Sequence, residues 1–186
     1  HNSKINKIFL KLKKSKADYQ FITASENNAW LLNIRGNDSK YTPIPCCYIL
    51  FDKKKNIKFF CDLEKISASF KKSFNKIKFI NIKNTNLVLS QIYKKNIMID
   101  KNTCSKYFES IILKNNKISN QQDPVYALKA IKTKKEIENI KKAHIYDGAA
   151  LTKYLFWLKN NFLKKKITEI SAEKKLFNFR KKNKNF

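Results

Sequence analysis

Hydrophobic positions along the first two thirds of the chain change period repeatedly, which predicts short helices and strands in alternation. A helical spacing predicts a helix over 4–14, where the apolar positions are Ile5, Ile8, Phe9 and Leu12. Runs rich in Ile, Phe, Tyr and Leu predict strands at 19–23, 46–51, 57–61, 77–82 and 96–100. Helices are predicted between them at 24–34, 65–74 and 85–94, and a further helix over 103–114 closes this part of the chain. Strands interleaved with helices indicate an α/β fold, a mixed sheet flanked by helices.

Local signals refine this pattern at two helix ends and one turn. Ser25 stands where an N-cap is expected for the helix over 24–34. Gly36 stands where a left-handed residue is expected to end that helix. The segment 53–56 lies between two predicted strands and is expected to join them in a hairpin.

The pattern changes at Asp123, where an Asp-Pro pair breaks the chain and longer helical patterns follow. Thr133 and Glu136 predict a capping box, in which each side chain bonds the backbone amide of the other residue. Thr168 is expected to cap a final helix. The apolar positions of these two helices are Ile137, Ile140, Ala143, Leu151, Tyr154, Leu155 and Leu158, then Ile170, Ala172, Leu176 and Phe179. With no sheet after them, such helices leave their apolar faces uncovered.

Domain organisation follows from this change of pattern. We expect one domain over 1–122 and, over 123–186, the start of a second domain that is cut short. The hydrophobic fraction of 42% is sufficient for a packed core. No apolar run reaches the roughly 20 residues that cross a bilayer. The first 16 residues lack the layout of a signal peptide, and the chain begins with His, so we expect a fragment trimmed at both ends.

The four cysteines do not predict a disulfide framework or a zinc site. Cys46 and Cys47 are adjacent, whereas Cys61 and Cys104 stand by themselves, so no CxxC pair occurs. Neighbours on a strand point to opposite faces, and we expect one of the adjacent pair to face the core and the other a helix or the surface. Buried, reduced thiols are the expected state.

The net charge of +27 raises the hypothesis of a nucleic-acid-binding protein. Against it, Arg35 and Arg180 are the only arginines, and recognition of base edges favours the arginine fork. The lysines are also spread along the sequence, together with Asn and Ile, a trio that AT-rich codons favour. No specific nucleic acid is therefore expected as a partner.

Two blocks of sequence, in the same order, carry a resemblance to a known family. The first lies between Asp18 and Asp52 and is centred on Trp30-Leu31-Leu32-Asn33-Ile34-Arg35-Gly36-Asn37-Asp38, then Tyr41-Thr42-Pro43. The second comprises Asp123-Pro124, Leu128-Lys129-Ala130-Ile131-Lys132, Glu136-Ile137-Glu138, Ala143-His144-Ile145, Asp147-Gly148-Ala149-Ala150-Leu151 and Trp157-Leu158. The first block resembles the middle domain of the three-domain Xaa-Pro aminopeptidases, in the creatinase/prolidase group of pita-bread metallopeptidases. The second resembles the junction into their catalytic domain.

The resemblance implies a creatinase N-terminal-like middle domain over 1–122 and the leading helices of a pita-bread α+β domain over 123–186. The whole enzyme would be a cytoplasmic homodimer that removes an N-terminal residue preceding proline from peptides. Two divalent metal ions, expected to be manganese, would activate a water molecule. The family's metal ligands, two Asp, one His and two Glu, come later in its sequences. We therefore expect no catalytic residue and no metal ligand in this chain, which should be inactive by itself.

Five residues are candidates for supporting roles. Trp30, Arg35 and Asp38 either line the edge of the substrate cleft or serve the architecture, with Trp30 in the core and the other two paired to fix the loop. His144 and Asp147 share a helical face with apolar neighbours. They either support a metal ligand or form a structural hydrogen-bonding pair or interdomain contact.

Two rival interpretations remain at this stage. One is a prolidase-like or creatinase-like member of the same group, with the same fold and another substrate. The other is a noncatalytic basic module that binds nucleic acid. Chain beyond residue 186 would separate them, since a complete set of metal ligands marks a peptidase.

Overall fold

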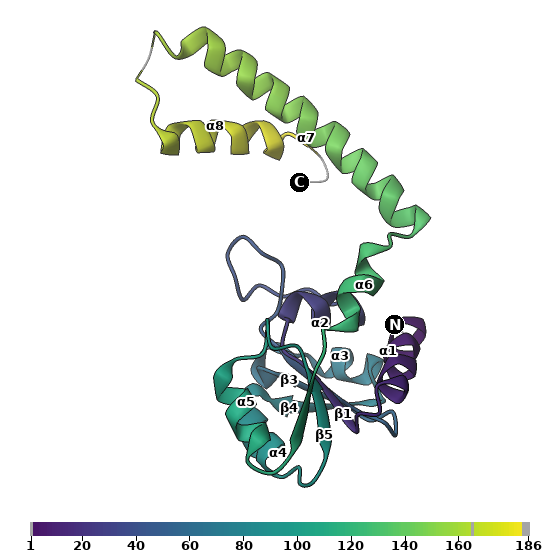
Figure 1. Ribbon diagram of the computed structural model, residues 1–186. Coiled ribbons are helices and arrows are strands. Elements are labelled where there is room, and N and C mark those ends of the chain that lie inside the picture. Colours follow the sequence, from purple (N-terminus) through teal and green to yellow (C-terminus); the bar gives the residue numbers. More distant parts are fainter. Residues whose placement is uncertain (1, 165, 184–186) are drawn as a thin grey trace. The chain divides into compact units, whose positions relative to one another are not determined.

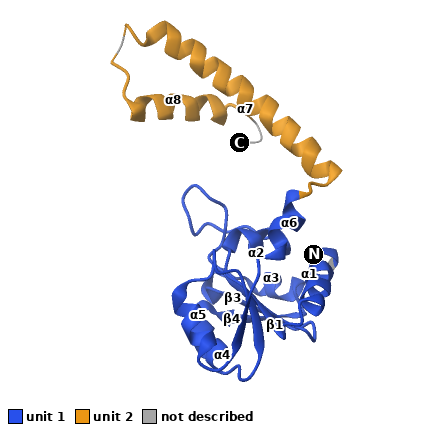
Figure 2. Ribbon diagram, in the orientation of Figure 1, with its two compact units in different colours: residues 1–130 blue, residues 131–186 orange. Residues whose placement is uncertain are grey.

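The computed structural model describes residues 2–164 and 166–183 (Figure 1). They form two compact units, residues 1–130 and 131–186, called the first and second unit below (Figure 2). Within the described residues, no helix is both long enough and apolar enough to cross a membrane. The first unit extends eight residues past the predicted boundary at 122, and the assignment of 123–186 to a second domain stays a prediction.

The first unit is built on one six-stranded mixed sheet, which confirms the predicted fold class (Figure 1). Its strands are β1 (Tyr19–Ile22), β2 (Tyr48–Asp52), β3 (Ile57–Cys61), β4 (Ile77–Asn81), β5 (Asn96–Ile99) and β6 (Lys117–Asn120). They lie in the order β4-β3-β2-β1-β5-β6. Strand β2 runs antiparallel to both its neighbours, and the other pairs are parallel. The turn after Asp52 joins β2 to β3 in the expected hairpin.

Helices cover both faces of this sheet. The helices of the first unit are α1 (Asn2–Lys14), α2 (Ser25–Leu32), α3 (Ala68–Ser73), α4 (Thr85–Ser90), α5 (Lys106–Leu113) and α6 (Pro124–Ala130), with short 3-10 turns η1 (Leu63–Lys65) and η2 (Ile82–Asn84). One core packs α1, α2, α3 and α6 against one face of the sheet. The other core packs α4 and α5 against the opposite face.

Neighbouring residues of the central strands divide between the two cores. Leu50 of β2 lies in the second core, whereas Phe51 lies in the first, in edge-to-face contact with Phe9 of α1. Phe59 and Phe60 of β3 divide in the same way. Each of these four side chains is almost fully buried, and burial of a side chain of this size contributes about 2 kcal/mol. The two-residue repeat of a strand therefore sends apolar groups into both layers.

The predicted elements of the first unit are present, with shifted ends. The helix predicted to reach residue 94 ends at Ser90, and the strand predicted to begin at residue 46 begins at Tyr48. The sequence pattern predicts neither β6 nor α6. Strand β6 has a single apolar residue, Ile118, because it lies at the edge of the sheet and is partly exposed. Helix α6 is seven residues long, shorter than a periodic pattern needs to be recognised.

The prediction of buried thiols holds for three of the four cysteines, and one of the adjacent pair faces the core as predicted. Cys47, Cys61 and Cys104 are buried and free, and Cys46 is free and exposed. Cys46 and Cys47 precede β2 instead of belonging to it, and one of them is exposed while the other is buried. Burial raises the pKa of Cys47 and of Cys61 to about 12, so both stay protonated and unreactive at neutral pH.

The second unit consists of α7 (Lys134–Asn161) and α8 (Glu169–Lys181), which pack against each other. Thr133 and Glu136 form the predicted capping box of α7, and Thr168 caps α8 as predicted. Among the described residues of this unit, Ala150 is the only one that is buried. Large apolar side chains stay exposed on it, among them Ile145 (70%), Phe156 (73%) and Ile170 (78%).

We predict that the two units differ in protection from amide hydrogen exchange. The amides of β1, β2 and β3 pair on both sides and lie between two cores, so they should exchange only on global unfolding. Helices α7 and α8 have little buried apolar surface, so most of their amides should exchange through local opening. Exchange measured by mass spectrometry on a demonstrated monomer checks this difference. Equal protection in α7 and β2 would contradict it.

Candidate functional site

The segment that follows α2 is shaped by Asn33 and Gly36. Asn33 adopts the left-handed conformation (φ 55°) that ends the helix, a position that Asn fills best after Gly. Gly36 does not, so the predicted role for Gly36 is wrong. Its lack of a side chain serves a close approach instead: a Cβ at Gly36 would lie 2.8 Å from the Cβ of Pro45. The Gly36 amide also donates to the carbonyl of Pro43 (3.2 Å), which holds the two arms of the loop together.

Ser25 also has a role other than the predicted one. The N-cap of α2 is Ala24, which has no side-chain capping bond. The Ser25 hydroxyl donates to the carbonyl of Cys47 (3.2 Å) and lies 3.3 Å from its amide, which donates back. Ser25 therefore fastens the far end of the loop to α2, a long-range contact that the local sequence does not signal.

Asp38 is the anchor of this loop. Its carboxylate accepts from the amide of Cys46 (2.7 Å) and from Lys65 Nζ (2.6 Å). The bond from Lys65 and then that from Cys46 hold the pKa of Asp38 below its usual value. The architectural interpretation of Asp38 pairs it with Arg35, and the structure pairs it with Lys65 of η1 instead. Asp38 stays ionised at neutral pH and ties the loop to the segment after β3.

A pocket of about 230 Å³ lies between this loop, β3 and α3. Its apolar lining comes from Ile34, Phe59, Ile66 and Phe70, and its polar lining includes Arg35, Asp38, Asp62 and Lys65. Arg35 is exposed, and its Nη1 donates to the carbonyl of Ile34 (2.8 Å). Such a pocket can hold a small apolar side chain beside a negatively charged group.

Trp30 is not among the described residues that line that pocket. The indole is half-buried beside the first core, and Lys4 Nζ lies 3.7 Å from the ring centroid. Lys4 also donates to the carbonyl of Trp30 (2.9 Å). The structure thus brings Arg35 and Asp38 to one pocket and places Trp30 against α1.

A buried polar cluster centred on Asp123 escaped the sequence analysis. The Asp123 side chain is 4% exposed and accepts from Asn27 Nδ2 (2.6 Å) and from the amide of Val125 (3.0 Å). Its own amide donates to the carboxylate of Asp100 (2.9 Å). Asp before Pro is the signal that could have found it, since Asp is a preferred N-cap and Pro a preferred first helical residue. The pair that we predict as a break also starts α6.

The cluster continues to the surface through α6. Lys129 Nζ donates to Asn27 Oδ1 (2.5 Å) and lies 4.5 Å from the ring centroid of Tyr126. The Tyr126 hydroxyl donates to the carboxylate of Glu26 (2.9 Å). These bonds join α6 to α2, so the last helix of the first unit is held against the helix that precedes the pocket loop.

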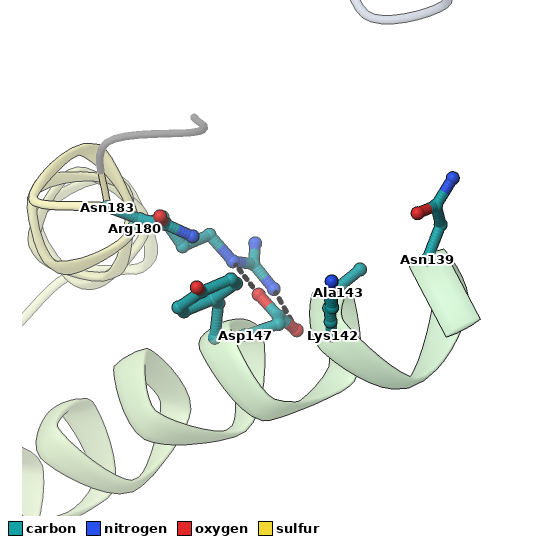
Figure 3. Close-up of a pocket in the computed structure, with 7 residues that line it drawn as sticks. Asn139, Lys142, Ala143, Asp147, Arg180 and Asn183 are labelled. Carbon is teal, nitrogen blue, oxygen red and sulfur yellow. Dashed lines mark hydrogen bonds and ion pairs between the residues drawn. The ribbon is translucent and has the colours of Figure 1, made fainter.

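In the second unit, Asp147 binds Arg180 (Figure 3). Arg180 Nε donates to Asp147 Oδ1 (2.6 Å), and Nη2 donates to Oδ2 (3.2 Å). This pair keeps the pKa of Asp147 below its usual value. It joins α7 to α8 beside a hollow of about 680 Å³. His144 is exposed on α7, one turn before Asp147. The proposed supporting roles of His144 and Asp147 stay predictions.

Among residues 2–164 and 166–183, no group of three or more His, Cys, Asp and Glu side chains is arranged to hold a metal ion.

We predict that Gly36→Ala destabilises the first unit. A Cβ there would clash with the rigid ring of Pro45, and overpacking of this kind costs about 1–3 kcal/mol. Gly148→Ala is the matched control, because a Cβ at Gly148 in α7 would meet no described atom within 4 Å apart from its chain neighbours and the adjoining helix backbone. Alanine is the better helix former, so the control should be neutral or stabilising. Urea unfolding followed by circular dichroism measures both, and an undiminished midpoint for Gly36→Ala would contradict the predicted clash.

We predict that Asp123→Ala costs about 3 kcal/mol, because it removes the cap of α6 and leaves Asn27 without its acceptor. Asp123→Asn should cost less at pH 7, since it keeps an acceptor oxygen and removes a buried charge. Burial raises the pKa of Asp123, so the folded state binds its proton more tightly than the unfolded state does. The wild type should therefore gain stability relative to Asp123→Asn as the pH falls from 7 to 4. If the wild type instead lost stability relative to Asp123→Asn as the pH falls from 7 to 4, the raised pKa of Asp123 would be contradicted.

Comparison with known proteins identifies relatives of this chain. Residues 1–136 match the creatinase/prolidase N-terminal domain. The chain is 32% identical over 199 aligned residues to "Probable Xaa-Pro aminopeptidase P" of Paracoccidioides lutzii, an alignment that covers 98% of this chain and 32% of the relative. It is 29% identical to Xaa-Pro aminopeptidase 1 of Dictyostelium discoideum, covering 100% of this chain and 30% of the relative. The chain thus spans about a third of the length of these curated relatives.

Solved structures agree with the sequence relatives. The X-prolyl aminopeptidase of Caenorhabditis elegans, described as a cytosolic enzyme with a di-nuclear active site, superposes with a TM-score of 0.84 at 26% identity. That match covers 99% of this chain and 31% of the other. An Xaa-Pro dipeptidase of Bacillus anthracis shares the fold, with a TM-score of 0.67 at 18% identity, over 97% of this chain and 48% of the other. The chain therefore belongs to the creatinase/prolidase family, and residues 1–136 carry the N-terminal domain of that family.

Proposed function

We propose that this chain is part of an Xaa-Pro aminopeptidase, a metallopeptidase that releases an N-terminal residue when proline follows it. The observation that carries the proposal is the similarity of both units to such enzymes, over 98% or more of the chain. Residues 123–186 would then form the leading helices of the catalytic domain. The peptide bond before proline has no N–H, which gives a dedicated peptidase its role.

The pocket beside Arg35 supports a place at the edge of the substrate cleft. Asp38 holds the loop through Cys46 and Lys65, so the exposed guanidinium of Arg35 is presented from an ordered segment. Arg35 would attract the carboxylate of a bound peptide, and the apolar lining would accept a small side chain. Trp30, which belongs to the helix before this loop, would pack against the first core instead of forming a wall of the pocket.

The metal ions of the proposed enzyme require ligands beyond the described residues. The comparison enzyme of C. elegans is described as di-nuclear, and no described group of acidic, histidine or cysteine side chains here fits a metal ion. For the whole protein we propose two divalent ions, manganese being the expected pair, together with a cytoplasmic location and a homodimeric state.

A prolidase is the nearest alternative. Prolidase structures share the fold at lower likeness, and the fold by itself does not select a substrate. The difference is chemical: an aminopeptidase accepts peptides that continue after proline, whereas a dipeptidase requires a free proline carboxylate.

We predict that the 186-residue chain hydrolyses no Xaa-Pro peptide and binds no stoichiometric manganese. The protein encoded by the gene extended past Phe186 should release the first residue from Gly-Pro-Pro in the presence of manganese, and not from Gly-Ala-Ala. Amino-acid release measured by chromatography and manganese titration calorimetry test both forms. Cleavage of Gly-Pro alone would favour the prolidase. Turnover by the 186-residue chain, with its purity shown by an inactive mock preparation, would contradict the proposal that catalysis needs residues outside this chain.

A further inference from the structure

The strands of the first unit's sheet begin or end along two opposite sides of the sheet, and these two sides are called edges below. The two edges differ in charge. Strands β1, β5 and β6 are parallel and begin at one edge. The antiparallel strand β2 ends there, so β3 and β4 also begin there. The segments that meet at this edge are therefore the ones just before β1, β4, β5 and β6, together with the turn between β2 and β3.

Folding gathers at this edge lysines that are far apart in the sequence. Ten exposed lysines come from the segments 14–16, 53–55, Lys76, 94–95 and 114–117, and we call this set the lysine edge. Two acidic residues, Asp18 and Asp52, accompany them. At the opposite edge, the loops 33–47, 62–67, 82–84, 100–105 and 121–123 carry five acidic and five basic residues. The positive charge is thus concentrated on one side of the sheet.

The two acidic residues are occupied in holding the backbone. Asp52 accepts from the amides of Lys54 (2.8 Å) and Asn56 (2.9 Å), which shapes the hairpin turn. Asp18 accepts from the amide of Asn96 (3.0 Å) and pairs with Lys53. The carboxylates therefore order the segments that carry the lysines, and they neutralise few of them.

Part of the lysine edge is hollowed and preformed. A hollow of about 550 Å³ lies between the turns before β5 and β6, and its charged lining consists of Lys94, Lys95, Lys114 and Lys117 together with Asp18. The amide of Lys94 donates to the carbonyl of Asn115 (2.9 Å), and that of Lys117 donates to the carbonyl of Lys95 (2.8 Å). These bonds tie the two turns together, so the four lysines extend from one hydrogen-bonded frame.

An aromatic ring stands at the same hollow. Tyr93 is 58% exposed and lies in the lining, and Lys94 Nζ is 5.2 Å from the centroid of its ring. A positively charged groove beside an exposed aromatic ring is the arrangement that binds single strands, whose bases stack on the ring while phosphates meet the cations.

We infer that the lysine edge binds single-stranded nucleic acid without sequence preference, a function beyond the proposed peptidase activity. The nearly complete use of lysine favours contact with phosphates over recognition of bases. The hollow favours a flexible strand over a flat membrane, because a strand can follow its floor. Such binding is driven by the release of counterions and weakens steeply with salt.

Fluorescence anisotropy of a labelled 20-mer of oligouridine, titrated with the 186-residue chain between 50 and 200 mM KCl, tests this inference. The variant K94Q/K95Q/K114Q/K117Q removes the cations of the hollow. The variant K153Q/K159Q/K164Q/K174Q removes the same charge from exposed positions of the second unit. The slope of log affinity against log salt is negative, and loss of four phosphate contacts should make it less steep by about 3. At 100 mM KCl we expect at least a tenfold loss for the first variant and less than a twofold loss for the second.

The contribution of Tyr93 is measured in the same assay. Tyr93→Ala should weaken binding about tenfold, the equivalent of one stacked base, and Tyr93→Phe should not. Neither change should affect binding to an abasic oligonucleotide. Equal losses of affinity for the two lysine variants would mean that net charge alone drives binding, and this would overturn the inference. Absence of binding at 50 mM KCl would overturn it too, as would tighter, lysine-dependent binding to vesicles of anionic phospholipid.

Discussion

Burial of both faces of the central strands is the constraint on which the first unit depends. Adjacent residues such as Leu50 and Phe51 are both apolar and both buried, so neither face of the sheet can meet water. Helices must then cover each face, and the two cores with their two sets of helices follow from this requirement. The strands of the sheet leave room for polar chemistry at their ends, where the connecting segments reach solvent.

The two ends of the strands have different uses for that reason. At one end, a long loop held by Asp38 and Gly36 encloses a small pocket beside Arg35. At the other end, short turns carry lysines on a frame of backbone hydrogen bonds. Neither site needs a large cavity in the core, which is filled by interlocking aromatic side chains such as Phe21 and Phe60.

Local signals in the sequence succeeded where the partner of a residue lies within one turn. The capping box of Thr133 and the cap at Thr168 are contacts over three residues, and both formed as predicted. Ser25 and Gly36 failed for the opposite reason. Their partners, Cys47 and Pro45, lie 22 and 9 residues away and are brought close by the return of the loop. For the same reason, Asp38 pairs with Lys65, which the fold brings close, instead of with nearby Arg35.

The sequence by itself determined the α/β class, most of the strands and helices, and the family, because periodicity and matched blocks are properties of neighbouring residues. Tertiary structure decided the rest. It buried Asp123 beside Asn27, although 96 residues separate them, and it made the short segments β6 and α6 regular by giving them a strand and a helix to pack against. It also turned lysines spread over a hundred residues into one charged edge, because the direction of each strand fixes which connections meet, and strand direction is set by pairing across the sheet.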